Sequence, residues 1–313
     1  ILFGAIGALE YDNNPEAKVR PEQGLLKLRK ELGLFANIRP VKMFQSLIKN
    51  SPLKENIVKG TDLVIFRELT GGIYFGEKHI SVDGTVASDL CEYSEKEISR
   101  IAHMAFKAAK KRKKKLTLVD KANVLESSRL WRKTVTEIGK SYPEVKFECM
   151  FIDNAAVQMM LKPSQFDVIL TDNMFGDILS DQGSVIIGSV GLLPSASIGA
   201  NNAMFEPFHG SYPQAKGKNI ANPVASIFST AMLLQHFGLD EEANAIVFAV
   251  HESFAKKVVT ADILGSNKYG TDYVGDFISE HIVDSDENLN INDENIGLLD
   301  TLSSLFKLRN ALR

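Results

Sequence analysis

The stretch EKEISRIAHMAFKAAKKRKKKLTLVD (95–120) shows most directly how this chain folds. Apolar residues recur at helical spacing over 95–114, and the pattern then changes to the short apolar run KLTLVD (115–120), which is typical of a buried strand. The same alternation continues in both directions along the chain. Further strands are predicted at 62–69, 145–153 and 166–172, and a further helix at 127–140. This alternation favours an α/β protein with a substantial parallel sheet.

Composition and charge describe an ordinary globular chain. Its 313 residues are 44% hydrophobic and 24% charged, and the formal net charge is −3. Length alone suggests one large domain or two modest ones. The charge balance favours neither nucleic acid nor a membrane surface as a partner, and the apolar stretches are too short and interrupted for a membrane span. Cys91 and Cys149 are too few for a disulfide framework, which indicates a cytoplasmic protein.

The two ends of the chain differ in character from its middle. The first residues, ILFGAIG (1–7), are typical of a buried strand that runs into a glycine turn. Near the other end, residues 283–313 start with polar sequence that indicates a linker. The last part, IGLLDTLSSLFKLRNALR (296–313), has the pattern of a possible amphipathic helix.

The basic run KKRKKK (110–115) has two interpretations. One is a nucleic-acid contact, and the other is a solvated helix C-terminus, where cations complement the helix dipole. No aromatic residue is interleaved with the run and the whole chain is acidic, so the second interpretation is favoured.

Three arginines in short segments, two of which contain glycine, suggest an anion-binding site. Arg29 lies in RPEQGLLKLRK (20–30), Arg39 follows a short apolar run, and Arg67 lies in RELTGGIYFG (67–76). A guanidinium group presents paired donors that match the two oxygens of a carboxylate. The arginines therefore predict a small ligand that carries several carboxylates.

Two aspartates predict a metal site beside this clamp. Asp177 and Asp181 are four residues apart in TDNMFGDILSD (171–181), so a helix places both on one face, and Asp153 at a predicted strand end is a third candidate. Hard carboxylate oxygens suit a divalent cation. The alternative is that these aspartates cap the helix and complement its dipole.

Lys121 and Tyr74 are candidates for proton transfer. Lys121 follows a predicted strand end, and a buried lysine with a lowered pKa can act as a base. The alternative is an exposed lysine at a strand terminus. Tyr74 lies in TGGIYFG, where glycines allow close backbone approach to a ligand, and a tyrosine near a cation can act as a general acid. Its alternative is a hydrogen-bonded core tyrosine.

A long polar loop, EPFHGSYPQAKGKNIANP (206–223), has the donors to bind a nucleotide. By composition alone it is equally compatible with a surface loop. The GxGxxG dinucleotide fingerprint is absent from the chain.

In order and spacing, these segments resemble the isocitrate/isopropylmalate dehydrogenase family, the β-decarboxylating dehydrogenases, from Ile1 to about Ile282. The resemblance implies a two-domain α/β fold with a large mixed sheet and a homodimer with shared active sites. One domain would comprise 1–34 plus 188–282 on the cofactor side, and the other 35–187 with the dimer interface. The implied reaction is NAD-dependent oxidation of a 2-hydroxy acid, followed by loss of the carboxylate beta to the new ketone.

The resemblance also implies a role for each candidate residue. Arg29, Arg39 and Arg67 would hold the substrate carboxylates, and Asp153, Asp177 and Asp181 would bind Mg²⁺ or Mn²⁺. Lys121 would remove the hydroxyl proton and Tyr74 would protonate the enol carbon, with Lys121 and Asp153 provided across the dimer. Leu25 and Leu26 would form an apolar wall, which points to 3-isopropylmalate and leucine biosynthesis. The implied cofactor-binding residues are Glu22, Asn123, His209, Gly210, Ser211, Tyr212, Gln214 and Asn222.

Three departures from the family pattern bear on these expectations. The first strand of the family, with its GDGIGPE-like loop, is expected to be missing ahead of Ile1, and GALEY (7–11) stands where many relatives read GGPKW. Gln214 replaces an aspartate that grips the adenosine ribose, so NAD is expected with weaker discrimination against NADP. The alternatives are another 2-hydroxy diacid, such as tartrate or homoisocitrate, or an inactive fragment that serves as a structural or binding protein.

Overall fold

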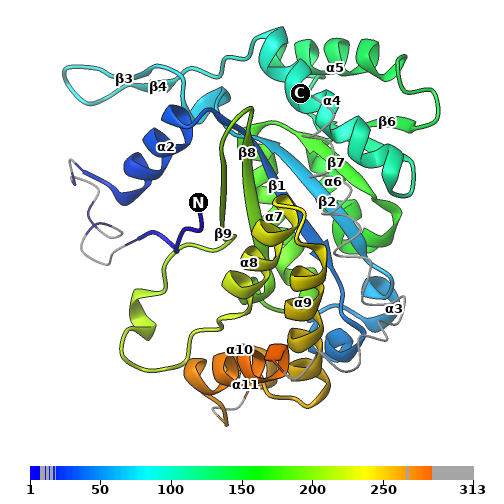
Figure 1. Cartoon of the computed structure of the whole chain (residues 1–313). Helices are drawn as coiled ribbons and strands as arrows, with labels where there is room; N and C mark the ends of the chain where they lie inside the picture. The colour runs from blue at the N-terminus through cyan, green and yellow to red at the C-terminus, as the bar shows by residue number, and fades with distance from the viewer. Residues whose placement is uncertain (8–10, 12–13, 15–16, 18, 266–267, 284–313) are drawn as a thin grey trace.

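A mixed sheet organises the described part of the chain, which comprises residues 1–7, 11, 14, 17, 19–265 and 268–283 of this computed structural model (Figure 1). Its seven strands follow the order β6-β5-β7-β2-β1-β8-β9. Their bounds are β1 Leu34–Lys42, β2 Asp62–Glu68, β5 Lys115–Asp120, β6 Lys146–Phe151, β7 Val168–Thr171, β8 Pro194–Gly199 and β9 Ala203–Pro207. A separate exposed hairpin is formed by β3 Lys78–Ile80 and β4 Ala87–Asp89.

The sheet contains a parallel half and an antiparallel half. Strands β6, β5, β7 and β2 pair in parallel, whereas β1, β8 and β9 are each antiparallel to the strand before them in the sheet. The predicted α/β fold with a large mixed sheet is confirmed. The predicted domain limits stay a prediction. Strands β1 and β8 belong to different proposed domains, and they pair within one continuous sheet.

The helices alternate with the strands as the sequence pattern predicts. The best example is α4, whose N-terminus is fixed by a capping box between Ser94 and Glu97 and whose apolar stripe is buried. The helices have the bounds α2 Pro21–Glu31, α3 Glu55–Val58, α4 Glu95–Lys111, α5 Glu126–Gly139, α6 Ile152–Leu161, α7 Asn173–Ile187, α8 Val224–His236, α9 Asp240–Ala255, α10 Ala261–Leu264 and α11 Thr271–Val283.

Helices cover both faces of the sheet. Neighbouring residues of a strand point to opposite faces, and Arg67 and Glu68 at the end of β2 show which helix lies on each side. Arg67 packs against α7, where a Cβ on Gly176 would stand 2.7 Å from the Arg67 Cβ atom. Glu68 meets Arg100 of α4 on the other side. The core therefore fills both faces of the sheet, with α4 on one side and α7 on the other, and it also includes buried residues of α5, α8 and α9.

The parallel strands bring the candidate site residues to one edge. In the register, Arg67 of β2 stands beside Thr171 of β7, and β5 and β6 continue the row. The segments that follow these strands contain Tyr74, Asp177, Lys121 and Asp153. Functional groups collect at the carboxyl ends of parallel strands because the connecting loops all emerge there.

Two predicted strands are wrong in detail. Leu2 forms a single bridge to Phe205 of β9, and Ile1 and Leu2 are each about half exposed rather than buried. These residues have one strand as a neighbour, so solvent reaches them. The predicted strand 145–153 ends at Phe151, and Asp153 lies in the first turn of α6, where the helix dipole favours an acidic side chain.

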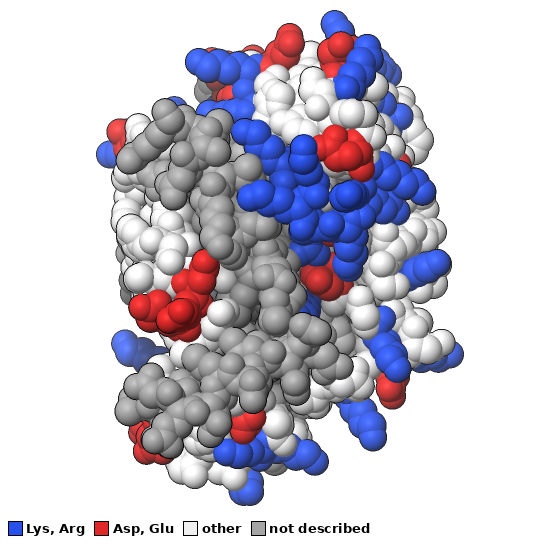
Figure 2. Space-filling view, turned by 45° about the vertical axis from the view of Figure 1, so that its right-hand side comes forward, with Lys and Arg blue, Asp and Glu red and all other residues white. Residues whose placement is uncertain are grey.

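The basic run at the end of α4 is only partly the predicted solvated terminus. Lys110 and Lys115 form ion pairs with glutamates, but Arg112 is buried and bridges Asp62 and Asp167. Burial of a guanidinium is tolerated here because two carboxylates satisfy it. Figure 2 shows a surface on which lysine and arginine side chains gather with acidic side chains among them.

The candidate linker and terminal helix at 284–313 lie outside the described residues. In the part of the chain that is described, no helix combines the length and the hydropathy that a membrane span requires.

Candidate active site

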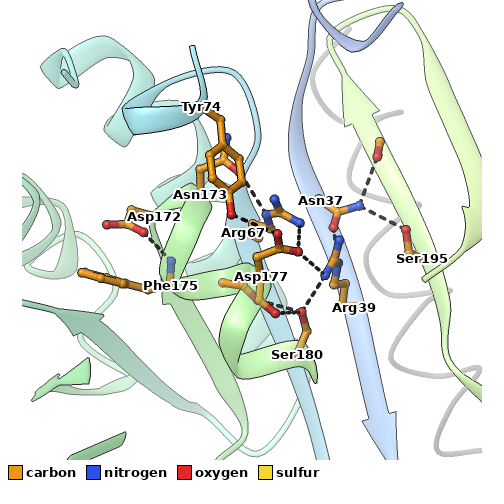
Figure 3. A network of polar contacts seen from close by, with 12 residues as sticks. Asn37, Arg39, Arg67, Tyr74, Asp172, Asn173, Phe175, Asp177, Ser180 and Ser195 are labelled. Atoms are coloured by element: carbon orange, nitrogen blue, oxygen red, sulfur yellow. Dashed lines mark hydrogen bonds and ion pairs between the residues drawn. The ribbon is translucent and has the colours of Figure 1, made fainter. Parts of the chain in front are cut away.

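Helix α7 presents two carboxylates to the sheet edge. Asp172 caps this helix, because its side chain accepts a hydrogen bond from the Phe175 amide at 2.8 Å. Asp177 and Asp181 lie farther along the helix, one turn apart, so the capping interpretation of these two residues is wrong. Neither side chain is used for capping, and Figure 3 shows that Asp177 contacts groups outside the helix.

Asp177 is the hub of the contacts in Figure 3. Its carboxylate accepts hydrogen bonds from Arg67 Nη1 at 2.5 Å, from Arg39 Nη1 at 3.2 Å and from the Tyr74 hydroxyl at 3.1 Å. Partial burial opposes ionisation of Asp177, but the charges of the two arginines outweigh it and lower the pKa of this carboxyl group. Asp177 therefore carries a negative charge and acts as a counterion for both arginines.

The two arginines are held by neutral side chains that sequence analysis did not identify. The Asn37 side-chain oxygen accepts from Arg39 Nε at 2.5 Å, and the Ser180 hydroxyl accepts from Arg39 Nη1 at 2.6 Å. The Asn173 side-chain oxygen accepts from Arg67 Nε at 3.0 Å. One available signal was the two-residue spacing of Asn37 and Arg39 on a strand, which places both on the same face.

Arg29 completes a cluster of positive charge. It donates to Glu206 of β9 at 2.7 Å, and both side chains are more than nine-tenths buried. Burial lowers the pKa of Arg39 to about 9, and the charges of Arg67 and Arg29 contribute to this shift. The three predicted arginines therefore lie within electrostatic reach of one another, in an environment suited to a multiply charged anion. Glu206 was not predicted as a site residue, although it begins the polar loop segment.

The donor set of Asp177 and Asp181 fits a divalent cation. Burial raises the pKa of Asp181, and the negative charge of Asp177 raises it further. Two hard carboxylates that repel each other are the arrangement that Mg²⁺ or Mn²⁺ would stabilise. Asp153 does not join them, since the described residues contain no group of three or more His, Cys, Asp or Glu side chains close enough to hold one metal ion.

Lys121 and Asp153 pair with each other instead. The Lys121 ammonium donates to the Asp153 carboxylate at 2.6 Å, and this hydrogen bond lowers the pKa of Asp153. Strands β5 and β2 are separated by β7, so the pair lies roughly 10 Å along the sheet edge from Arg67. Asn123 follows in an exposed turn. The assigned roles of Lys121, Asn123 and Asp153 stay predictions.

Tyr74 lies beside the carboxylates rather than in the apolar core. It ends the short 3-10 helix Gly72–Tyr74 and is partly buried. Burial raises the pKa of its hydroxyl group, and the charge of Asp177 acts in the same direction. The hydroxyl group therefore keeps its proton at neutral pH, as a proton donor requires.

Helix α2 carries the predicted apolar wall. Leu25 packs against a small cluster of Leu34, Leu69 and Met204. The next residue, Leu26, is partly buried. Both are on the helix that carries Arg29, and Glu22 is exposed in its first turn. The role of both leucines as an apolar wall stays a prediction.

The polar loop after β9 is anchored at both ends. The Ser211 amide donates to the Ile6 carbonyl at 2.9 Å, and a Cβ on Gly7 would stand 2.3 Å from the Ser211 hydroxyl oxygen. At the other end, the Asn222 side chain donates to Asp262 at 3.0 Å. Between these anchors, His209, Gly210, Tyr212 and Gln214 are accessible to solvent.

A cavity of about 300 Å³ lies at the base of this loop. It is lined by Lys218, Asn219, Ile220, Ala261, Tyr269 and Gly270. A cavity lined by both polar and aromatic side chains fits the polar and aromatic parts of a nucleotide. None of the predicted cofactor residues lines this cavity, and their individual roles stay predictions.

Sequence comparison identifies the class to which this fold and site belong. Residues 1–278 match the family described as isocitrate/isopropylmalate dehydrogenase. The chain belongs to this family, which places it among the decarboxylating oxidoreductases.

Individual relatives give a finer view. The 3-isopropylmalate dehydrogenase of Bacteroides fragilis strain YCH46 is 54% identical over 284 residues, which cover 90% of this chain and 80% of the relative. The enzyme of the same name from Aquifex aeolicus is 50% identical over 288 residues, which cover 90% and 79% of the two chains.

Two solved structures share the fold. Isocitrate dehydrogenase from Methylococcus capsulatus has a TM-score of 0.79 and 35% identity, with 89% of this chain and 80% of that chain covered. The TT0538 protein from Thermus thermophilus has a TM-score of 0.81 and 29% identity, with 92% and 57% covered.

Proposed function

We propose that this chain catalyses the NAD- and divalent-metal-dependent oxidative decarboxylation of (2R,3S)-3-isopropylmalate to 4-methyl-2-oxopentanoate, a step of leucine biosynthesis. The observation that supports this most strongly is the buried pair Arg39 and Arg67 on the single carboxylate of Asp177. Relatives with 50–54% identity are named for this substrate. The two free cysteines fit a reducing, cytoplasmic location.

The arginine cluster would bind the two carboxylates of the acid. Arg39 and Arg67 are kept in place by Asn37, Ser180 and Asn173, so their donors are oriented before the ligand arrives. Part of the donor capacity of these arginines is used by Asp177 in the ligand-free arrangement. An incoming carboxylate would take over those donors, and a preorganised guanidinium loses little entropy in the exchange.

Asp177 and Asp181, with Asp153 of the partner subunit, would hold Mg²⁺ or Mn²⁺. When bound, the metal would polarise the 2-oxygen of the substrate as a Lewis acid. Lys121 of the partner subunit would take the proton of the 2-hydroxyl group. After carbon dioxide leaves, the Tyr74 hydroxyl would return a proton to the enol carbon, for which its raised pKa keeps it protonated.

NAD would be held by the loop between Phe208 and Pro223 and would supply the hydride acceptor. Its binding would use the accessible groups of His209, Tyr212 and Gln214, in the loop whose residues 218–220 line the cavity of about 300 Å³. No helix N-terminus with a GxGxxG turn is available, so loop amides and side chains would carry the phosphate contacts.

A shared active site explains why the proposed residues form two groups within one chain. Lys121 and Asp153 hold each other about two strands away from Arg67. If a second subunit placed its own Lys121–Asp153 pair beside Asp177 and Asp181, each site would gain its base and a third carboxylate. We therefore propose a homodimer in which each subunit completes the site of the other.

The substrate is tested by NADH production with four acids in turn. We expect 3-isopropylmalate to give the highest kcat/KM, above isocitrate, tartrate and homoisocitrate, and EDTA to abolish turnover until Mg²⁺ or Mn²⁺ is restored. A higher kcat/KM for another acid would overturn the assignment to isopropylmalate. Binding of isopropylmalate in calorimetry without any NADH formation would instead favour the inactive binding protein.

A further inference from the structure

A buried carboxylate next to the site has no role in the mechanism so far. Glu68 is the last residue of β2, adjacent to Arg67, and its side chain is fully buried on the opposite face of the sheet. A carboxylate taken out of water is costly unless hydrogen bonds compensate it. The identity of its hydrogen-bond donors therefore indicates what Glu68 stabilises.

The donors to Glu68 come from the turn that follows β2 and from α4. One carboxylate oxygen accepts from the backbone amides of Thr70 at 3.0 Å and Gly71 at 2.7 Å. The other accepts from the Thr70 hydroxyl at 2.9 Å and from Arg100 Nη2 at 3.0 Å. Both oxygens of Glu68 are thus saturated, and three of the four donors belong to residues 70–71.

This turn leads directly to Tyr74 and packs closely against the Tyr93 side chain. A Cβ on Gly71 or Gly72 would stand 2.3–2.7 Å from the nearest atom of the Tyr93 side chain, and Gly72 has a φ of +74°. The Gly72 amide also donates to the Glu92 carbonyl at 2.9 Å. The 3-10 helix that carries Tyr74 starts at Gly72, so the placement of residues 70–72 determines where the Tyr74 hydroxyl lies.

A second link ties the same turn to the arginine cluster. The Asn173 side chain donates to the Gly71 carbonyl at 3.2 Å and accepts from Arg67 Nε at 3.0 Å. The turn is therefore held from one side of the sheet by Glu68 and from the other by Asn173. Glu68 is the acidic member of this network, and it accepts hydrogen bonds from two backbone amides.

We propose that Glu68, itself held by Arg100, is the positioning residue for Tyr74, and that it fixes the turn so that the Tyr74 hydroxyl faces the Asp177 carboxylate. The functional part of this inference rests on the proposed role of Tyr74 as proton donor. A glutamine cannot replace Glu68, because its NH₂ group would face either two backbone N–H donors or Arg100. One or more of these donors would then be left unsatisfied in a buried place.

The first test measures backbone dynamics and needs no activity. Amide hydrogen exchange over residues 69–75 should be at least about tenfold faster in Glu68→Gln than in wild type. A matched control is Asp167→Asn, which alters another buried carboxylate that is paired with an arginine, Arg112, at the opposite end of the same sheet. Unchanged exchange over 69–75 in Glu68→Gln, or equal acceleration in the control, would overturn the inference.

The second test uses a double-mutant cycle with 3-isopropylmalate. Glu68→Gln should lower kcat about tenfold or more while KM for the acid changes by less than about threefold, because the arginines are not displaced. If Glu68 acts through Tyr74, Glu68→Gln combined with Tyr74→Phe should be no slower than Tyr74→Phe alone. Losses that multiply in the double variant would contradict a positioning role.

The two tests separate this inference from the proposed reaction. If wild type does not turn over isopropylmalate, the proposed function fails, whereas the exchange experiment still decides the role of Glu68. If Glu68→Gln does not fold, Arg100→Lys is the milder variant, since it keeps the positive charge but removes the planar donors. It should accelerate exchange over the same residues, and no acceleration would contradict the inference.

Discussion

Single residues decide the charge balance of the site. Asp177 serves as counterion to Arg39 and Arg67, accepts from Tyr74 and belongs to the predicted metal pair. The same carboxylate would be released from the arginines when a substrate carboxylate binds and would be available to a cation. In the ligand-free chain, the Asp177 oxygens therefore accept from the arginine donors that the substrate carboxylate is expected to use.

Asp172 makes folding stability depend on pH. Burial raises the pKa of its carboxyl group to about 7, far above the ordinary value near 3.8 of an exposed aspartate. Between these two values the folded chain holds the proton and the unfolded chain does not, so stability falls as pH rises through this window. We expect Asp172→Asn, which can still cap α7, to flatten this slope and to be more stable than wild type at pH 8 by on the order of 1–3 kcal/mol.

Urea unfolding at pH 5 and pH 8 measures this effect. Asp83→Asn is the control, because hydrogen bonds from Ser81 and Thr85 lower the pKa of Asp83 to about 2 and it does not titrate between these pH values. Asp172→Asn with the same pH slope as wild type would show that Asp172 is ionised in the folded chain throughout this range.

Gln214 bears on cofactor choice. An aspartate at this position would repel a 2′-phosphate, whereas glutamine can bond a ribose hydroxyl without such repulsion. We predict NAD as the better cofactor of wild type, and Gln214→Asp should lower NADP use more than NAD use by about 1–3 kcal/mol. The measurement is kcat/KM with each cofactor. An unchanged ratio would mean that residue 214 does not face the ribose.

At the level of elements, α7 depends on two glycines for its approach to the sheet. A Cβ on Gly176 would stand 2.7 Å from Arg67 Cβ and Cγ, and a Cβ on Gly183 would stand 2.7 Å from Val41 Cγ2. Glycine normally weakens a helix interior by about 1 kcal/mol relative to alanine. Close packing against β1 and β2 explains why the helix nevertheless has glycine at both positions.

Alanine at these two positions should distinguish the effect of helix packing on stability from the effect of Arg67 placement on substrate binding. Gly176→Ala and Gly183→Ala should each cost about 1–3 kcal/mol, because overpacking exceeds the gain in helix propensity. Only Gly176→Ala displaces Arg67, so it should also raise KM for the acid by at least about tenfold, whereas Gly183→Ala should leave KM close to wild type. Chemical denaturation and steady-state kinetics provide the two readouts. Equal KM values in both variants would contradict the account of Gly176.

At the level of the whole molecule, the proposed site needs two chains. Lys121 with Asp153 and Arg67 with Asp177 form separate groups within one chain. A mixture of inactive Lys121→Ala and inactive Arg67→Ala proteins should therefore recover activity, up to about one quarter of wild type for random pairing, since in heterodimers one of the two sites is intact. Subunit exchange is verified with differently tagged chains. No recovery despite verified exchange would place each complete site within a single chain.

Local sequence pattern was sufficient for most of the elements and for the positions of several candidate site residues. Strands β2, β5 and β7 and helices α4 and α5 follow from apolar periodicity, because burial on one or both faces requires it. The arginines were recognised because guanidinium donors match the oxygens of a carboxylate, and the aspartate pair because carboxylate oxygens suit a divalent cation. Asp177 and Asp181 share a helix, so their spacing alone placed them together.

Contacts between residues far apart in the sequence required the fold itself. Spacing gave no sign that Glu206 would pair with Arg29, that Asn173 would hold Arg67, or that Arg112 would be buried within a basic run. Pairings of this kind depend on strand order and on the depth to which each helix packs, and no local pattern encodes either. The same reason explains the separation of Asp153 from the other aspartates, because β5 lies between β6, which Asp153 follows, and β7, which Asp177 and Asp181 follow.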